Sequence, residues 1–209
     1  MAVWAAGDSA SGACFIEVGD IDLDGRLDLV FPNVFSSTVA YLLNDGNLLD
    51  PRKSVKLRHL SSASKRINNA RLVDLNRDGY LDIVTANHVG NAVSVFIHRG
   101  DGTFKKELLH QVGNSPAIIV FGDLNSDGWN DIIALNWQED FITVLMNRGD
   151  GHLLQGKEYK VGSASHGIDT GDLNGDGHVD IVTVTTSSLK ILRGLGNGQF
   201  RLPFLQVKH

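Results

Sequence analysis

The sequence predicts an all-β protein made of four repeated four-stranded sheets, arranged as the blades of a β-propeller. An acidic motif occurs four times, beginning at Asp20, Asp74, Asp123 and Asp172, so the spacings are 54, 49 and 49 residues. Each copy runs into a short β-branched stretch such as "DIVTAN", which is typical of a buried strand. Nowhere do apolar residues keep the spacings of three and four that an amphipathic helix needs, so helical repeats are disfavoured.

Four strands are expected in each unit. The first precedes the acidic loop, the second follows it, and the third leads into a glycine turn such as "NDGN" or "RGDG", which is a hairpin signal. The fourth is a shorter mixed stretch after that turn, such as "ELLHQVG". Units of about fifty residues with four strands are typical of propeller blades. We therefore expect one repeat domain over residues 1–209, with repeats at approximately 13–62, 63–113, 114–162 and 163–209.

Composition excludes several classes of function. The chain has 209 residues, is 42% hydrophobic and carries a formal net charge of −5, which argues against a strongly basic nucleic-acid-binding protein. No apolar run approaches the roughly 20 residues of a membrane span, and the first residues have neither the basic region nor the long apolar region expected of a signal peptide. Cys14 is the only cysteine, so no intrachain disulfide can form.

Each acidic motif has the spacing of a calcium loop. Calcium takes roughly six to eight oxygen ligands, so a short loop must turn sharply and direct alternate side chains inward. The expected ligands are the side chains at positions one, three, five and nine and the backbone carbonyl at position seven, with glycine at position six for the turn. These sets are Asp20, Asp22, Asp24, Arg26 and Asp28; Asp74, Asn76, Asp78, Tyr80 and Asp82; Asp123, Asn125, Asp127, Trp129 and Asp131; and Asp172, Asn174, Asp176, His178 and Asp180.

An EF-hand loop begins in the same way, but the motif does not continue as one. An EF-hand needs a glutamate at position twelve and flanking helices, and that position is Phe31, Thr85, Ala134 or Thr183. A metal-free turn rich in Asp and Asn would also use these residue types. Four copies with acids at the same three positions favour the ion, and without it the clustered carboxylates would repel one another. We expect about four Ca²⁺ ions, one per repeat, in an extracellular setting where calcium reaches about the millimolar level.

In these residues the chain resembles the FG-GAP and VCBS repeat family, the calcium-loop propeller repeats of integrin α-subunit heads, fungal lectins and many exported bacterial proteins. The DxDxDGxxD loop followed by D(I/L)V carries the resemblance, which covers nearly the whole chain. It implies a calcium ion in the first hairpin of each blade. The "GAP" after the loop is replaced here by "FPN", "TAN", "ALN" and "TVT", so integrin-like ligand recognition is not implied.

A ligand is expected at the end of the blades opposite the calcium loops. Strand alternation places the calcium loops and the glycine turns at one end and the remaining loops at the other. Aromatic, amide and charged side chains at the second end suit a sugar or a peptide, although functionless exposed loops would look much the same. The candidate ligand-binding residues are Phe35, Arg66, His88, Asn114, Trp137 and His166.

The function expected from these features is a non-catalytic, secreted binding module. It is not expected to be an enzyme, because HExxH and GxSxG motifs are absent and the carboxylates are better used as metal ligands. Lectin-like carbohydrate recognition is the first hypothesis, protein adhesion the second, and an accessory propeller of a larger secreted enzyme the third. Two Arg-Gly-Asp tripeptides, at 99–101 and 148–150, lie in glycine turns where Gly and Asp serve the turn.

A count of strands suggests that the array is open. Both "AVWAAGD" at the start and "LPFLQVKH" at the end have the pattern of a fourth strand, which leaves one such strand in surplus. We therefore expect either a fragment of a larger propeller, with about seven blades, or self-association that closes the ring. A compact four-bladed monomer is the alternative.

Overall fold

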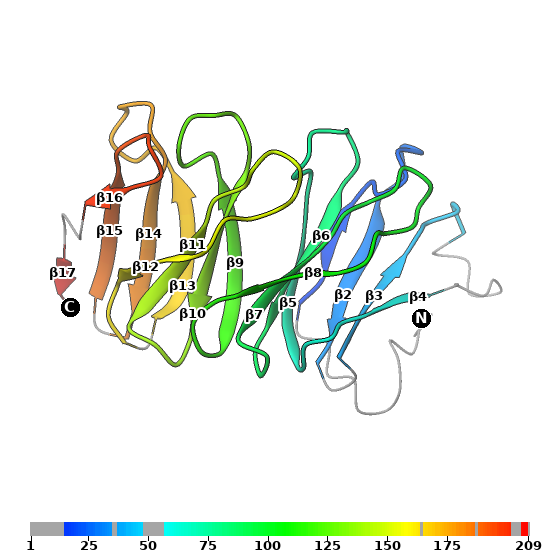
Figure 1. Ribbon diagram of the computed structural model, residues 1–209, viewed down its shortest axis with the longest axis horizontal. Coiled ribbons are helices and arrows are strands. Elements are labelled where there is room, and N and C mark those ends of the chain that lie inside the picture. The colour runs from blue at the N-terminus through cyan, green and yellow to red at the C-terminus, as the bar shows by residue number, and fades with distance from the viewer. Residues whose placement is uncertain are drawn as a thin grey trace.

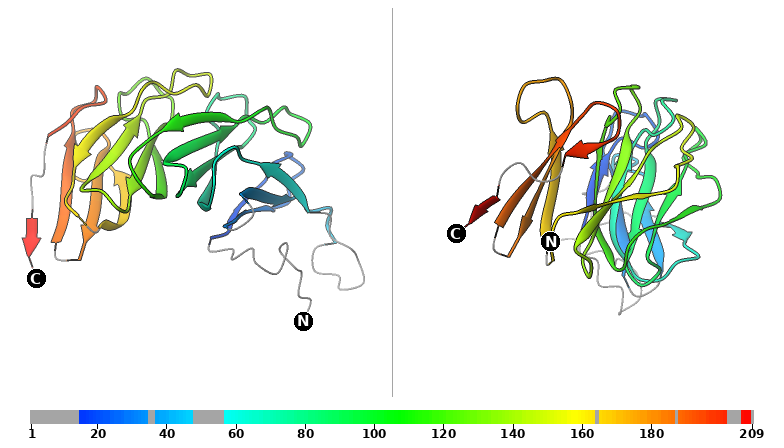
Figure 2. Two further views of the ribbon diagram at one scale, coloured as in Figure 1. Left: turned by 60° about the horizontal axis from the view of Figure 1, so that its bottom comes forward. Right: turned by 60° about the vertical axis from the view of Figure 1, so that its left-hand side comes forward.

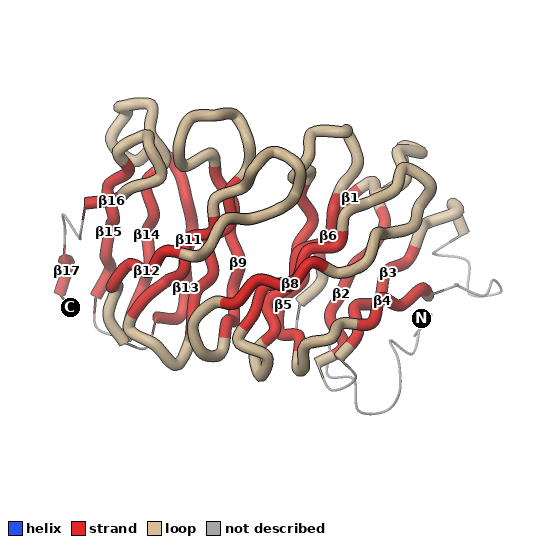
Figure 3. The backbone as a smooth tube through the Cα atoms, viewed as in Figure 1, coloured by secondary structure: helices blue, strands red, loops and turns tan. Residues whose placement is uncertain are grey.

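Four antiparallel sheets follow one another along the chain (Figure 1). This computed structural model describes residues 15–34, 37–47, 57–163, 165–186, 188–201 and 206–208. Within these residues there is no helix, and so none long and apolar enough to cross a membrane. Strands and loops alternate throughout, and the loops gather at the two ends of the sheets (Figure 3).

The strands of each sheet are neighbours in sequence order. The first sheet contains β1 (Glu17–Gly19), β2 (Asp28–Asn33), β3 (Thr38–Leu42) and β4 (Arg58–Ser61). The second contains β5 (Ile67–Val73), β6 (Asp82–Asn87), β7 (Ala92–Phe96) and β8 (Leu108–Gln111). The third contains β9 (Pro116–Gly122), β10 (Asp131–Asn136), β11 (Phe141–Leu145) and β12 (Lys157–Lys160). The fourth contains β13 (Ser165–Gly171), β14 (Asp180–Thr185), β15 (Ser188–Gly194), β16 (Phe200–Arg201) and β17 (Gln206–Lys208).

In the fourth sheet the outer position is divided between two short strands. β16 pairs with one half of β15 and β17 with the other half. The contact of Gly194 with Phe200 repeats the isolated bridges of His98 with Phe104 and of Asn147 with Leu153. The blade plan is therefore the same, and the expected C-terminal fourth strand is present as β17. The expected N-terminal strand "AVWAAGD" lies outside the described residues.

The sheets pack face to face in a curved array (Figure 2). The first strand of each sheet lies on the inner side, because β5 contacts both β1 and β9, and β9 contacts β13. No described strand joins the first sheet to the fourth, so the array is open. This is the architecture of propeller blades, as the sequence predicts, in an incomplete ring.

Three apolar layers between the sheets form the core. One of them brings Val84 and Ala86 of β6 against Ile132 and Ala134 of β10. Both faces of the inner blades are covered in this way, and every residue of β6 and β10 is buried. That explains why apolar residues follow one another without polar ones between them in residues 83–84 of β6 and 132–135 of β10.

Candidate functional site

All four acidic loops adopt one backbone conformation. Position four and position six both have left-handed φ angles, which curl the loop into a tight turn. At position four the φ values are 60° for Leu23, 52° for Arg77, 60° for Ser126 and 77° for Gly175. At position six they are 85° for Gly25, 88° for Gly79, 89° for Gly128 and 83° for Gly177. The sequence reveals the need for glycine at position six but not the left-handed residue at position four.

The first and fifth aspartates hold this turn from inside. The first Asp accepts a hydrogen bond from the position-six N–H at 2.8–2.9 Å in every repeat. The fifth accepts one from the position-seven N–H at 2.9–3.0 Å. Carboxylates that bond backbone amides of their own loop must point into it, which is the orientation that a calcium loop requires.

The ninth aspartate fixes the loop to the sheet. Asp28, Asp82, Asp131 and Asp180 are all buried. One oxygen of each accepts the position-two N–H at 2.7–3.1 Å. The other accepts an N–H from the end of the third strand or from just beyond it, at 2.7–2.8 Å; the donors are Asn44, His98, Asn147 and Gly194. The ninth carboxylate therefore joins three segments of its blade, a structural role that the sequence does not reveal.

Burial changes the acidity of these ninth carboxyls. Loss of solvent raises the pKa of Asp82 and Asp131 to about 6, against the lowering effect of the two backbone hydrogen bonds. The pKa of Asp28 is also raised, mainly by burial. At the exposed fourth loop the backbone N–H of Gly177 is the main cause of a lowered pKa at Asp172. A divalent cation in a loop would favour the ionised form of all these groups.

Two observations, in the first and second loops, are what a bound cation would explain. Asp20, Asp22 and Asp28 place ligand oxygens within 4.8 Å of one another. One oxygen of Asp22 and one of Asp74 are buried without any hydrogen-bond partner among the described residues. A buried carboxylate oxygen without a partner is costly, and a hard cation would satisfy it.

The side chains at position seven have a packing role. Tyr80 stacks on His98, with ring centroids 4.9 Å apart, and lies against Gly100 of the glycine turn. Trp129 lies against Gly149 and His178 against Gly196 in the same way. The sequence predicts only a carbonyl ligand at this position, with a free choice of side chain. The structure shows instead that the side chain covers the glycine turn of its own blade.

The glycine turns use the charged groups of the Arg-Gly-Asp tripeptides. Asp101 accepts hydrogen bonds from the N–H and the hydroxyl of Thr103 at 2.9 and 2.5 Å. Arg99 Nε donates to the carbonyl of Phe104 at 3.2 Å, and Asp150 accepts the N–H of His152 at 2.9 Å. These contacts agree with a turn-forming role for the tripeptides.

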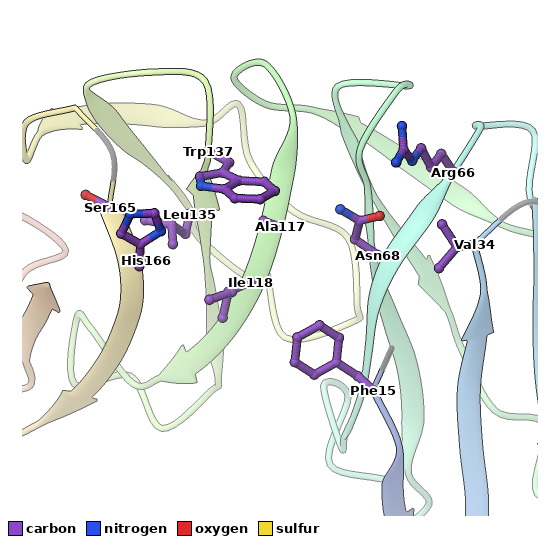
Figure 4. Close-up of a pocket in the computed structure, with 10 residues that line it drawn as sticks. All are labelled: Phe15, Val34, Arg66, Asn68, Ala117, Ile118, Leu135, Trp137, Ser165 and His166. Carbon is purple, nitrogen blue, oxygen red and sulfur yellow. The ribbon is translucent and has the colours of Figure 1, made fainter. Parts of the chain in front are cut away.

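A pocket of about 450 Å³ lies at the opposite end of the blades, where the inner strands begin (Figure 4). Its lining residues are Phe15, Val34, Arg66, Asn68, Ala117, Ile118, Leu135, Trp137, Ser165 and His166. Trp137 is half exposed, and its indole has the imidazoles of His88 and His166 at ring-centroid distances of 6.4 Å on either side. His166 and Trp137 enter from one side of the pocket, and Asn68 and Phe15 lie across from them (Figure 4).

A repeated β-bulge provides one lining residue from each of three blades. Asn68, Ala117 and His166 each lie six residues before their acidic loop and occupy the same place in their repeats. In each blade the register between the first and second strands shifts at this residue. Bulges commonly redirect a side chain beside a functional site. An alignment of the repeats to one another could have revealed this position. It lies at a constant distance from the acidic loop, but its residue type differs in every repeat.

The structure brings together most of the predicted ligand-binding residues that it describes. Arg66, Trp137 and His166 line the pocket, and His88 contacts Trp137. Burial is the main cause of the lowered pKa of His88, followed by the charge of Arg66. Asn114 does not line the pocket, because its amide bonds Asn91 and Glu139 further out along the same end. Phe35 lies outside the described residues.

Comparison with known proteins now identifies the repeats. A model of the FG-GAP-like repeat matches residues 20–85, 74–134 and 123–183. The chain belongs to the FG-GAP-like repeat family. Each match begins at the first Asp of one acidic loop and ends within the second strand of the next blade, so the family pattern contains the loops described above. A comparison with curated proteins gives no match.

Several solved structures share the fold of this FG-GAP-like chain at low sequence identity. A lectin from Agrocybe aegerita, described as recognising non-reducing terminal N-acetylglucosamine, has a TM-score of 0.61 at 20% identity. A protein from Lactobacillus plantarum has a TM-score of 0.63 at 16% identity, and the biofilm matrix protein Bap1 of V. cholerae 0.57 at 17%. The matches cover 91%, 94% and 93% of this chain but only 51%, 57% and 28% of those proteins.

Proposed function

We propose that this chain is a non-catalytic, extracellular binding module, that calcium in its acidic loops stabilises the blades, and that the pocket beside Trp137 binds carbohydrate. The observation that carries the proposal is the half-exposed indole at the mouth of a pocket that is also lined by the polar side chains of Arg66, Asn68 and His166. Within the described part of the chain, the side chains of Arg66, Asn68 and His166 make no hydrogen bond.

The pocket chemistry suits a sugar. The apolar face of a pyranose ring can lie against an indole, and the flanking imidazoles limit where it can lie. The amide of Asn68 can both donate to and accept from hydroxyl groups, and Arg66 donates only. A few polar groups over a mostly apolar lining are typical of small-molecule sites. The terminal N-acetylglucosamine named for the Agrocybe aegerita lectin is the first sugar to test.

Calcium belongs to the proposal because the loops fit it and because three or four carboxylates per loop oppose folding without it. The millimolar calcium of extracellular fluids suits loops of this kind, which supports a secreted setting.

Protein adhesion is the second candidate, since Phe15, Val34 and Ile118 give the pocket an apolar floor that an apolar side chain could fill. As an accessory propeller of a larger enzyme, the module would use the same pocket.

The test is a glycan array, followed by calorimetry with the best sugar, on the intact chain in calcium. We expect Trp137→Ala to weaken binding by about fivefold or more, because aromatic anchors commonly contribute about 1–3 kcal/mol. Leu109→Ala is the control: Leu109 is also exposed, but it lies on the outer strand β8, away from the pocket. Binding of no glycan, or equal binding by both variants, would overturn carbohydrate recognition at this pocket.

A further inference from the structure

In each blade one residue directly precedes the residue whose N–H bonds the ninth Asp at the end of the third strand. In the fourth blade this preceding residue differs from its equivalents. Leu43, Ile97 and Met146 occupy this position in the first three blades, and it is Arg193 in the fourth. The three apolar side chains pack against the glycine turn of the next blade: a Cβ added to Gly102 would lie 2.9 Å from Leu43, and one added to Gly198 2.9 Å from Met146. In the described residues no fifth blade follows, and Arg193 turns to its own acidic loop.

Arg193 forms an ion pair with the fifth aspartate of that loop. Its Nη2 lies 2.7 Å and its Nε 3.3 Å from one oxygen of Asp176. The pair lines a pocket of about 340 Å³ together with Asn174 and Asp180, which are two of the other expected ligands. The guanidinium therefore lies beside the oxygens that would bind calcium.

In the two middle loops an amide of the same loop takes this place. The equivalent oxygen of Asp78 accepts a hydrogen bond from Asn76 at 2.9 Å, and that of Asp127 accepts one from Asn125 at 2.7 Å. A side-chain amide can turn to present its oxygen, so these loops can become all-oxygen sites. A guanidinium has only donors and keeps its charge, so it cannot become a ligand.

The first loop also has an arginine beside its fifth aspartate, because Arg26 pairs with Asp24. It differs by a fourth carboxylate, Asp22, which has a buried oxygen without a partner among the described residues. The convergence of Asp20, Asp22 and Asp28 needs no contribution from Asp24. The fourth loop has Asn174 in place of Asp22, and each of its carboxylate oxygens already has a hydrogen-bond partner.

We infer that Arg193 is the built-in counter-ion of the fourth loop, so that this chain binds three calcium ions strongly and its fourth loop folds without one. A divalent ion there would have to displace the guanidinium or share three carboxylates with a positive charge close by. This inference rests on the proposed role of calcium, and it replaces one ion per repeat with three ions for four repeats.

The test is calorimetric titration of calcium into the metal-stripped full chain. We expect three tight sites in the wild type and a fourth in Arg193→Leu, which restores the residue type of the other repeats, with the affinity of the fourth loop raised at least tenfold. Arg193→Gln removes the charge with little change in size and should act in the same direction. Arg201→Leu is the control, because Arg201 is exposed on the adjacent strand β16 and its substitution changes the net charge by the same amount.

A second pair of variants assigns the ions to loops. Asp127→Asn should reduce the wild-type number from three to two, whereas Asp176→Asn should leave it at three. Four wild-type sites of similar affinity would overturn the inference and leave the calcium proposal intact. The inference would also be overturned if the number of tight calcium sites were the same in the wild type, Arg193→Leu and Arg193→Gln, provided that circular dichroism shows both variants to be folded. No calcium binding at all would instead overturn the proposed role of calcium.

Discussion

At the scale of single residues, the acidic loop combines two kinds of constraint. Its carboxylates are positioned by backbone hydrogen bonds, and its backbone is bent by two left-handed residues separated by one position. Three repeats accept a residue with a Cβ at the first of these, although a left-handed φ costs such residues roughly 1–2 kcal/mol. The second is glycine in all four repeats. The conformation is therefore maintained even where the local sequence does not favour it.

Gly79→Ala tests the backbone constraint separately from the metal. Gly79 has a φ of 88°, and a Cβ added there would meet nothing within 4 Å, so only backbone strain should result. We expect the free energy of unfolding to fall by about 1–2 kcal/mol in denaturant titrations, in EDTA as well as in calcium. Gly167→Ala is the matched control, because Gly167 also has open space but no left-handed φ. An equal loss in both variants would contradict the explanation.

At the scale of the strand and the blade, buried polar pairs tie the second strand to the third. Asn87 Nδ2 donates to the hydroxyl of Ser94 at 2.5 Å, and Asn136 Nδ2 donates to that of Thr143 at 2.9 Å. All four residues are buried, where an unpaired polar group is costly. The pairs thus favour one register of the two central strands, since a slip would break the buried hydrogen bond between their members.

A double-mutant cycle on Asn136 and Thr143 measures this contribution. Asn136→Ala should lower the free energy of unfolding by about 1–3 kcal/mol, because it removes the shorter of the two hydrogen bonds that the hydroxyl of Thr143 accepts, the other being from the N–H of Gly113. Thr143→Val removes the hydroxyl at nearly constant size. The two losses should be coupled by about 1 kcal/mol, so the double variant should be more stable than the sum of the single losses predicts. Strict additivity would show that the pair does not stabilise the hairpin.

The blade could be predicted from sequence and the pocket only in part, for a reason that belongs to this scale. The acidic motif, the β-branched run and the glycine turn are local signals, and they repeat four times. Part of the pocket lining instead comes from Asn68, Ala117 and His166, which lie on three different blades. Only the packing of those blades and a shared bulge bring them together. The hydrogen bonds by which the ninth Asp joins its loop to the third strand could not be predicted for the same reason. Asp82 and His98, for example, are sixteen residues apart.

At the scale of the whole molecule, each blade has one face that the next blade covers. The exposure of the residue at loop position two shows whether that face is covered. Ile21, Leu75 and Leu124 are 0%, 0% and 1% exposed, whereas Leu173 of the fourth blade is 53% exposed. Val184 is 46% exposed for the same reason, while its equivalent in the third blade, Leu135, is 1% exposed. Arg193 adds a charge to the same face, which lies open among the described residues.

The last prediction compares the same substitution at a covered and an open blade face. Leu124→Ala should lower the free energy of unfolding by about 2–5 kcal/mol, because it leaves a cavity between the third and fourth blades. Leu173→Ala removes the same atoms from a site already in contact with water, so a loss of less than about 1 kcal/mol is expected. Denaturation is to be measured in calcium at several protein concentrations. A large loss at Leu173 that grows with protein concentration would show that a second copy covers the face in solution, because association stabilises the folded state by mass action. A large loss independent of concentration would show instead that part of the same chain covers it.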